Sequence, residues 1–173
     1  MTVSSAPPAP TWSMQRLMRA ASYAVDALAV ASFTGMFLCV LVQVVLRYGF
    51  DRPLVWSDEL ARYLFVWCAF LGWIVAARRR SHLAIGVLAD RCRPRGRAAF
   101  ALIAAVTAIV FSAVLFTYGV QITSRNTDVE TVALFFPFAL VYAIVPVAAA
   151  AVILYAIADA IAAWRVLFAA KTS

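Results

Sequence analysis

Long apolar runs separated by short charged segments dominate the pattern of this chain. Mostly apolar stretches occupy about residues 24–46, 58–77, 98–122 and 132–158. A helix of about 20 mostly apolar residues crosses a hydrocarbon core of ~30 Å. Lipid offers the backbone no hydrogen-bond partners, so such spans must be helical. The pattern therefore predicts an all-α integral membrane protein with four transmembrane helices, contained in a membrane domain at residues 14–168.

The composition strengthens this prediction. Of all residues, 65% are hydrophobic and 13% are charged, whereas soluble domains carry about 25% charged residues. The alternative, a water-soluble helical bundle, needs helices with a polar face, but these stretches are apolar on all sides. Residues 1–13, rich in Ser, Ala and Pro, are expected to form a disordered tail, and residues 169–173 a short second tail.

The arginines indicate how the spans are oriented. Seven arginines lie between the second and third spans, whereas Arg125 stands alone between the third and fourth. Short cytoplasmic loops carry an excess of Lys and Arg, so both termini and the central loop are predicted to be cytoplasmic. Because the basic residues flank spans, we expect membrane lipids rather than nucleic acid as their partner. The candidate headgroup contacts in this loop are Arg78, Arg79, Arg80 and His82.

The spans offer little chemistry of their own. No acidic residue lies in the middle of a span, and the sole histidine, His82, follows an arginine cluster. A proton-coupled carrier needs a buried ionisable group, and haem needs axial ligands. The cysteines, Cys39, Cys68 and Cys92, form no pair at metal or disulfide spacing. The sequence therefore predicts no catalytic residue, metal or cofactor, and it argues against independent transport.

Charge gathers where the second span begins, in "RPLVWSDELARYLFVW". Ser57 is a candidate N-cap, which places Asp58 and Glu59 in the first turn, where the helix dipole favours anions. Arg62 follows at three- and four-residue spacing and is expected beside the two carboxylates. One interpretation is a capped, anchored helix start. The other is a polar cluster at the outer membrane face that docks a partner, formed by Arg47, Trp56, Asp58, Glu59 and Arg62.

Small residues and prolines indicate where helices pack. Ala27, Ala31 and Gly35 recur at every fourth position of the first span, and Gly72 lies in the second. Small residues allow helix backbones to approach closely in lipid. Pro146, in the middle of the fourth span, removes a backbone donor and predicts a kink.

The central string "VVLRYGFDRPLVWSDELARYLFVWCAFLGWIVAARRRSHLAI" resembles the signature of the small membrane subunit of TRAP (tripartite ATP-independent periplasmic) transporters. The chain departs from that family at Ile85-Gly86, where an acidic residue is usual, and at Val147, where a glycine often follows the proline. The matching elements are Arg47-Tyr48, Pro53-Leu54, Trp56, Glu59, Ala61-Arg62-Tyr63, Gly72 and the basic cluster before His82.

The resemblance implies a function. In that family, a large membrane subunit carries the substrate and sodium sites, and a periplasmic protein captures the substrate, usually an organic acid. The small subunit scaffolds the large one in the bacterial inner membrane and adds to the docking face. Two alternatives stay open on the residues alone: a self-contained four-helix exporter acting as a homodimer, and a membrane assembly factor.

Overall fold

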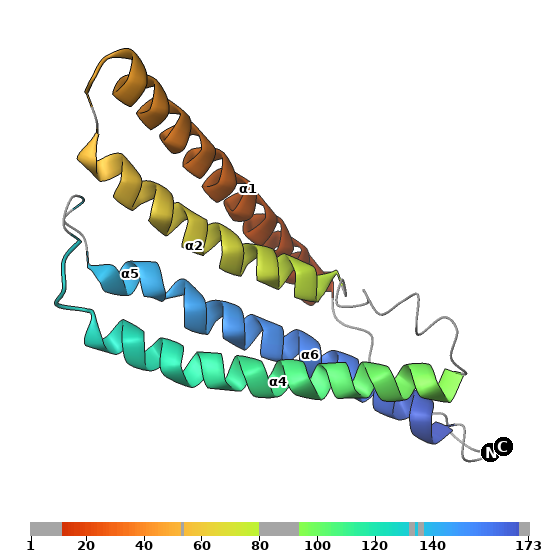
Figure 1. The fold of residues 1–173 in the computed structure, drawn as a ribbon. Helices are drawn as coiled ribbons and strands as arrows, with labels where there is room; N and C mark the ends of the chain where they lie inside the picture. Colours follow the sequence, from red (N-terminus) through yellow and green to blue (C-terminus); the bar gives the residue numbers. More distant parts are fainter. Residues whose placement is uncertain (1–11, 53, 80–93, 132–133, 135–136, 170–173) are drawn as a thin grey trace.

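The computed structural model describes residues 12–52, 54–79, 94–131, 134 and 137–169, and four long apolar helices run through them (Figure 1). Each helix is long and apolar enough to cross a membrane, which confirms the predicted fold class. Arg80, His82 and most of the two predicted tails lie outside the described residues. The helices are α1 (Trp12–Gly49), α2 (Val55–Arg78), α4 (Pro94–Arg125), and α5 (Phe138–Tyr142) followed by α6 (Ile144–Ala169).

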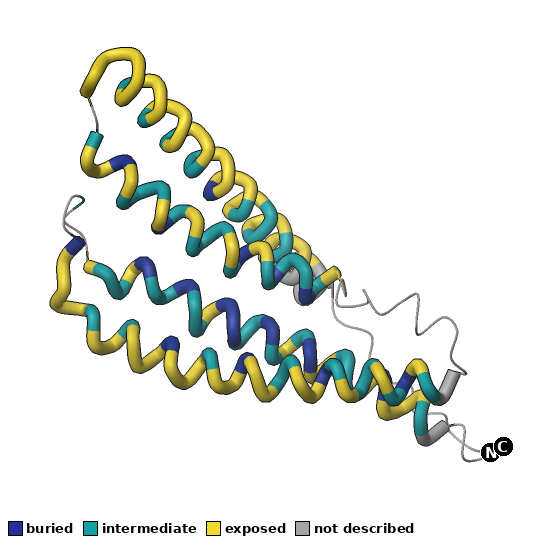
Figure 2. The backbone as a smooth tube through the Cα atoms, viewed as in Figure 1, coloured by how far each residue is buried: buried dark blue, intermediate teal, exposed yellow. Residues whose placement is uncertain are grey.

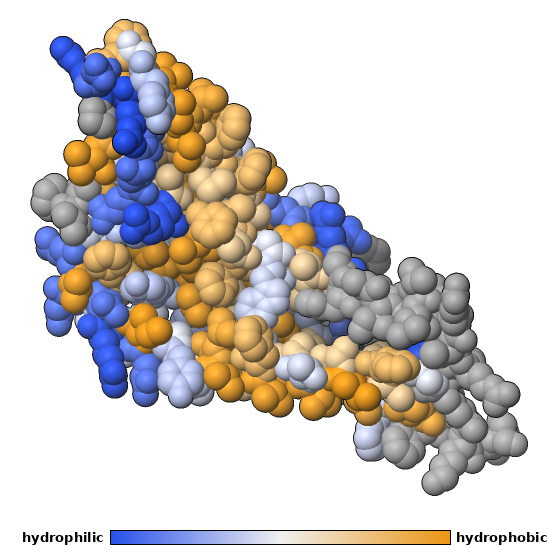
Figure 3. All heavy atoms as spheres, in the orientation of Figure 1, coloured by the Kyte–Doolittle hydropathy of each residue, from blue (hydrophilic) through white to orange (hydrophobic). Residues whose placement is uncertain are grey.

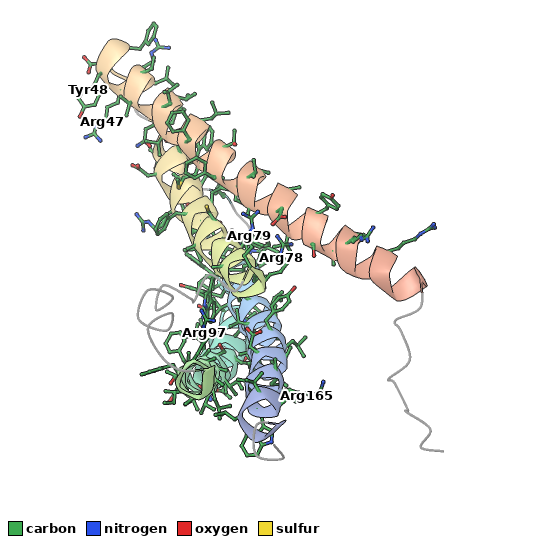
Figure 4. All side chains as sticks on the ribbon, turned by 90° about the vertical axis from the view of Figure 1, so that its right-hand side faces the viewer. Arg47, Tyr48, Arg78, Arg79, Arg97 and Arg165 are labelled. Carbon is green, nitrogen blue, oxygen red and sulfur yellow. The ribbon has the colours of Figure 1, made fainter. Side chains whose placement is uncertain are left out.

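The helices form an open layer rather than a closed bundle. Their order across the layer is α1, α2, α6, α4 (Figures 1 and 4). Among the described helices, the backbone of α1 approaches only α2, and the backbone of α4 approaches only α5 and α6. An open layer has no enclosed centre, so most apolar side chains of α1 and α4 stay exposed (Figure 2).

The two ends of the layer differ. The α1–α2 turn and the α4–α5 connection lie at one end, which we call the short-loop end (Figure 1). The beginnings of α1 and α4 and the ends of α2 and α6 lie at the other end, which we call the termini end. Hydrophilic atoms gather at the short-loop end, whereas hydrophobic atoms cover the helices beyond it (Figure 3).

A tight turn joins α1 to α2. The carbonyl of Leu46 accepts hydrogen bonds from the backbone N–H of both Phe50 (3.2 Å) and Arg52 (3.1 Å). Asp51 between them has φ 54°, a left-handed conformation that Asp tolerates better than most residues. The chain therefore reverses within a few residues, and α2 returns beside α1.

The start of α2 corrects the predicted cap. The helix begins at Val55 with Leu54 in the N-cap position, and no side chain caps it. The hydroxyl of Ser57 instead donates to the carbonyl of Leu54 at 2.7 Å. The prediction of Ser57 as N-cap was wrong because the helix begins at Val55, two residues before Ser57. Asp58 does lie in the first turn, as predicted, whereas Glu59, also predicted there, follows it.

The fourth span is interrupted, as the proline predicted. Helix α5 ends at Tyr142 and α6 begins at Ile144, so the break at Ala143 lies almost one turn before Pro146. Pro146 has no N–H to donate to the carbonyl of Tyr142, and the next bond, from Val147 N to Ala143 O, is stretched to 3.5 Å. The span begins at Phe138, later than residue 132, and α6 continues to Ala169.

Helices α4 and α6 pack through small residues at every seventh position. On α4 the buried residues are Ala98, Ala105, Ser112 and Gly119, and on α6 they include Ala149, Ala156 and Ala163. A seven-residue repeat keeps one face of each helix toward its neighbour. The approach is closest at Gly119, where an added Cβ would lie 3.0 Å from Val145 Cγ1 and 3.1 Å from Pro146 Cδ.

The two helix pairs meet in one apolar cluster. Leu71 and Ile74 of α2 contact Ile144 and Ala148 of α6, and all four are buried. The Trp73 ring of α2 also meets Phe111 of α4 edge-on, with ring centroids 6.0 Å apart. This cluster fixes α2 in the middle of the layer, so that α2 positions both α1 and the outer polar residues.

Candidate partner-binding site

The short-loop end holds a hydrogen bond between α1 and α2. Gln43 Nε2 donates to Asp58 Oδ1 over 2.6 Å, and Cys39 Sγ lies 3.3 Å from the carbonyl of Ser57 one turn deeper. Asp58 therefore takes its partner from the neighbouring helix, whereas the sequence predicted Arg62. Both Asp58 and Arg62 are exposed, so Arg62 stays available on the surface.

Glu59 links the polar end to the aromatic packing of α5. Its carboxylate accepts a hydrogen bond from the hydroxyl of Tyr63, one turn later on α2. Tyr63 is buried, and its ring meets Phe138 edge-on with centroids 5.8 Å apart. Phe138 in turn stacks on Tyr142 at 6.2 Å. The Glu59 carboxylate is thus held by a side chain that also fixes the start of the fourth span.

Exposed groups surround these fixed carboxylates. Arg47 and Tyr48 lie at the end of α1 and point away from the helices (Figure 4), with the Arg47 guanidinium 6.0 Å from the Tyr48 ring centre. Trp56 is 42% exposed, and Arg62 lies one and a half turns further along α2. Of the predicted docking residues, Arg47, Trp56, Asp58 and Arg62 are exposed, and Glu59 is half-buried.

A second polar contact joins α1 to α2 at the termini end. Arg78 Nη2 lies 2.5 Å from Asp26 Oδ1, and Arg78 Nη1 donates to the carbonyl of Ser22 at 3.0 Å. The structure thus gives Arg78, a predicted headgroup contact, a partner within the chain. Arg79 is exposed beside it, so the lipid contact predicted for Arg79 stays open (Figure 4).

The predicted packing residues fall into two groups. Gly35 faces α2, where an added Cβ would lie 3.4 Å from Leu64 Cδ1, and Pro146 lies at the close approach of Gly119. Ala27 and Ala31 are exposed, and Gly72 has no atom of another residue within 4 Å of an added Cβ. These three face no helix in the described part of this chain.

The arrangement at the short-loop end suits the binding of a partner. In the described ranges, no group of three or more His, Cys, Asp or Glu side chains is placed to hold a metal ion. What the short-loop end presents is a mixed surface of arginines, fixed carboxylates and aromatic rings. Such a surface recognises a partner by charge pattern and aromatic contact.

Sequence reasoning missed three residues of this site. Gln43 is a polar residue in the uncharged stretch 27–46, and that position was the available signal for a contact between helices. Asp26 lies near the start of the first predicted span, and no local pattern pairs it with Arg78, 52 residues later. Nothing in the sequence indicated that Phe138 contacts Tyr63, because a single aromatic residue in an apolar span forms no recognisable pattern.

The sequence of the chain is similar to subunits of known transporters. Residues 36–166 match the family model described as tripartite ATP-independent periplasmic transporters, DctQ component. The chain is 29% identical over 92 residues to the sialic acid TRAP transporter small permease protein SiaQ of Vibrio cholerae, covering 53% of each chain. It is 30% identical over 87 residues to the C4-dicarboxylate TRAP transporter small permease protein DctQ of Vibrio cholerae, covering 50% of this chain and 38% of that protein.

A third relative is much longer. The chain is 40% identical over 58 residues to the sialic acid TRAP transporter permease protein SiaT of Haemophilus influenzae, which is 34% of this chain and 9% of that protein. The match therefore spans about half the length or less of the small permease relatives, and a small part of the long one.

Proposed function

Because the chain belongs to the DctQ component family of TRAP transporters, the small permease proteins of the bacterial inner membrane, we propose that it is a subunit of a sodium-coupled importer. In this role it scaffolds a large membrane subunit. It also helps to dock a periplasmic substrate-binding protein. The transported substrate crosses through the large subunit and not through this chain.

The open layer is the observation that carries the proposal. Helix α1 approaches only α2 in the described part of the chain, and apolar side chains cover its other faces. Without a hydrophobic effect between helices in lipid, association rests on close packing. The exposed Ala27 and Ala31 offer such a surface to a helix from another chain. A layer with unpartnered sides suits a scaffold better than a self-contained carrier, which needs an enclosed path.

The long relative supports a large membrane partner. In SiaT, the stretch similar to this chain is 9% of a permease protein. A polypeptide that contains a related stretch together with a much longer one indicates that the two parts act together. We therefore propose that a separate large permease chain takes that place here.

The short-loop end is the proposed docking face. The excess of arginines near the termini end supports a cytoplasmic position for that end, and the short-loop end is then proposed to face the periplasm. There, Arg47 and Arg62 are exposed, and Asp58 and Glu59 are held by Gln43 and Tyr63. Fixed carboxylates cost less side-chain entropy when a partner binds.

The proposed substrate class is an organic acid. The relatives are named for sialic acid and for C4-dicarboxylates, and both are carboxylates at neutral pH. The two substrates differ in size and shape, as expected if the small subunit leaves recognition to its partners.

Reconstitution tests the proposal. The chain should co-purify with the large permease encoded beside it, and sodium-driven uptake in liposomes should need both chains and the periplasmic protein. Liposomes with this chain alone are the control, and substrate uptake by them would refute the scaffold role. Failure of the two chains to associate would equally contradict it.

A further inference from the structure

An apolar groove of about 330 Å³ lies between α4 and the interruption of the fourth span. Val114, Tyr118 and Ile122 of α4 line one side, and Tyr142 of α5 and Val145 of α6 line the other. Gly119 lies at the base, where α4 comes closest to α6. The groove exists because the break at Ala143 displaces α5 from the line of α6 beside α4 (Figure 1).

The groove and the arginine beyond it together span about one leaflet of a bilayer. The lining on α4 runs from Val114 to Ile122, which is roughly 12 Å at 1.5 Å per residue. Arg125, the last residue of α4, lies almost one turn beyond the lining, roughly 16 Å from Val114. Half of a hydrocarbon core of ~30 Å is about 15 Å. A partner helix crosses both leaflets and needs contact along the whole of α4, whereas a single acyl chain fits this depth.

Charged residues that suit a phospholipid headgroup lie just beyond the groove, at the short-loop end. Val114, Tyr118, Ile122 and Arg125 follow one another at helical spacing and share one face of α4. Arg125 is exposed at the short-loop end, where a phosphate meets a bilayer-spanning helix. Asp128 and Glu130 follow in the same connection and are also exposed, so a headgroup with both a phosphate and an ammonium finds charges of both signs.

We propose that this groove binds one acyl chain of a zwitterionic phospholipid, with the lipid phosphate at Arg125 and the chain running past Tyr118 to Val114. The tyrosine rings of Tyr118 and Tyr142 form the two walls, and Gly119 leaves room at the base. A bound lipid fills the space beside the broken helix that the described residues leave open. The inference depends on the membrane location of the chain and not on its transport role.

Photolabelling with a lipid tests the proposal. The full chain is reconstituted in vesicles of phosphatidylethanolamine and phosphatidylglycerol. The vesicles include a phosphatidylethanolamine with a photoreactive diazirine in the middle of one acyl chain, and the labelled residues are mapped by mass spectrometry. The label is expected to concentrate on the residues that line the groove. Even labelling over all exposed apolar faces overturns the proposal.

Two valines on α4 provide a matched pair of variants. Val114 is 49% exposed in the groove wall, and Val120 is 45% exposed but is turned about 120° away from it. Val114→Trp fills the groove and should reduce its labelling to the level of the other exposed faces, whereas Val120→Trp should leave it unchanged. Unchanged labelling in Val114→Trp contradicts the proposal. If that variant loses its helical circular dichroism, Leu115→Phe, also in the groove lining, replaces it.

Two further arms separate the sources of binding. Arg125→Gln should weaken labelling by the phospholipid probe but not by a diazirine diacylglycerol, which has the same acyl chains but no phosphate and no charge, and equal effects on both probes contradict the headgroup assignment. The labelling is then repeated on the complex with the large permease. Groove labelling should persist there, and its loss would show that a protein segment occupies the groove instead of lipid.

Discussion

Arg78 of α2 and Asp26 of α1 form an ion pair, with Nη2 2.5 Å from Oδ1, at the end opposite the Gln43–Asp58 hydrogen bond. The two helices are therefore joined by polar contacts at both ends of their common length. The side chains are 19% and 37% exposed, respectively. An ion pair that is partly buried in this way is weakened less by solvent screening than a fully exposed one.

Removal of either partner should loosen the α1–α2 pair. Arg78→Gln or Asp26→Asn should each lower the free energy of unfolding by about 1–2 kcal/mol, because a partly buried charge loses its partner. A double-mutant cycle should give a coupling energy of about 1 kcal/mol. Unfolding by sodium dodecyl sulfate in mixed micelles measures these values. Arg79→Gln, next to the pair and exposed, is the control, and an equal loss there would argue against a specific bond.

Two glycines should respond to alanine in opposite ways. Gly119→Ala places a methyl group 3.0–3.2 Å from Val145 and Pro146, including the backbone nitrogen of Pro146, and should cost about 1–3 kcal/mol of unfolding free energy. Gly72→Ala meets no atom within 4 Å and should gain roughly 0.5–1 kcal/mol from reduced backbone entropy. Thermal unfolding of both variants measures the difference, and equal shifts would contradict the close approach of α4 and α6.

Ser112 should tolerate the loss of its hydroxyl. Its side chain is fully buried between α4 and α6, and its Oγ has no hydrogen-bond partner among the described residues. Ser112→Ala should therefore raise the free energy of unfolding by up to about 1 kcal/mol. Thr117→Ala, whose hydroxyl is exposed and donates to the carbonyl of Val114, should change it by less than about 0.5 kcal/mol. A large destabilisation of Ser112→Ala would show that the hydroxyl has a partner in the membrane.

The two roles of Tyr63 can be separated by substitution. Tyr63→Phe removes the hydrogen bond to Glu59 but keeps the edge-on contact with Phe138, so it should cost about 1 kcal/mol. Tyr63→Ala removes both and leaves a cavity, so it should cost about 3–5 kcal/mol. Tyr48→Phe, at an 80% exposed ring, serves as the control. Equal costs for the two Tyr63 variants would mean that the ring contact contributes little.

Charge reversal at the short-loop end tests the proposed docking face. Glu59→Arg and Arg62→Glu should each lower uptake by the reconstituted three-part system, because like charges at an interface slow association, by about ten-fold at low salt. The variant with both residues exchanged should partly recover. Arg165→Glu, exposed near the termini end, should leave uptake unchanged. Equal uptake in all variants would show that Glu59 and Arg62 only anchor the start of α2 and do not dock a partner.

The number and length of the helices could be predicted from the sequence, but the contacts between helices could not. Apolar length alone predicted the four helices, because lipid dictates both their length and their hydrogen bonding. Pro146 predicted the break in the fourth span because a proline lacks the backbone N–H that a continuous helix needs. The N-cap predicted at Ser57 was wrong, because Leu54, which has no capping side chain, occupies the N-cap position.

Contacts between helices depend on how the helices face one another. The search for small residues at every fourth position found Gly35, but it missed the row at every seventh position on α4, from Ala98 to Gly119. Likewise, Gln43 meets Asp58 only because the turn at Asp51 sets the register of α2 against α1. No local sequence pattern predicts that register. The prediction therefore relied on spacing within α2 and put Arg62 beside Asp58.

The polar contacts of α1 and α2 bear on how this protein is made. Arg78 bonds to Ser22 and Asp26, Gln43 to Asp58, and Cys39 to Ser57, all between the first two helices. During synthesis these groups can find one another as soon as Arg78 has left the ribosome, before α4 has emerged. The first two helices can therefore enter the bilayer from the translocon as a unit in which Arg78 and Asp26 already neutralise each other.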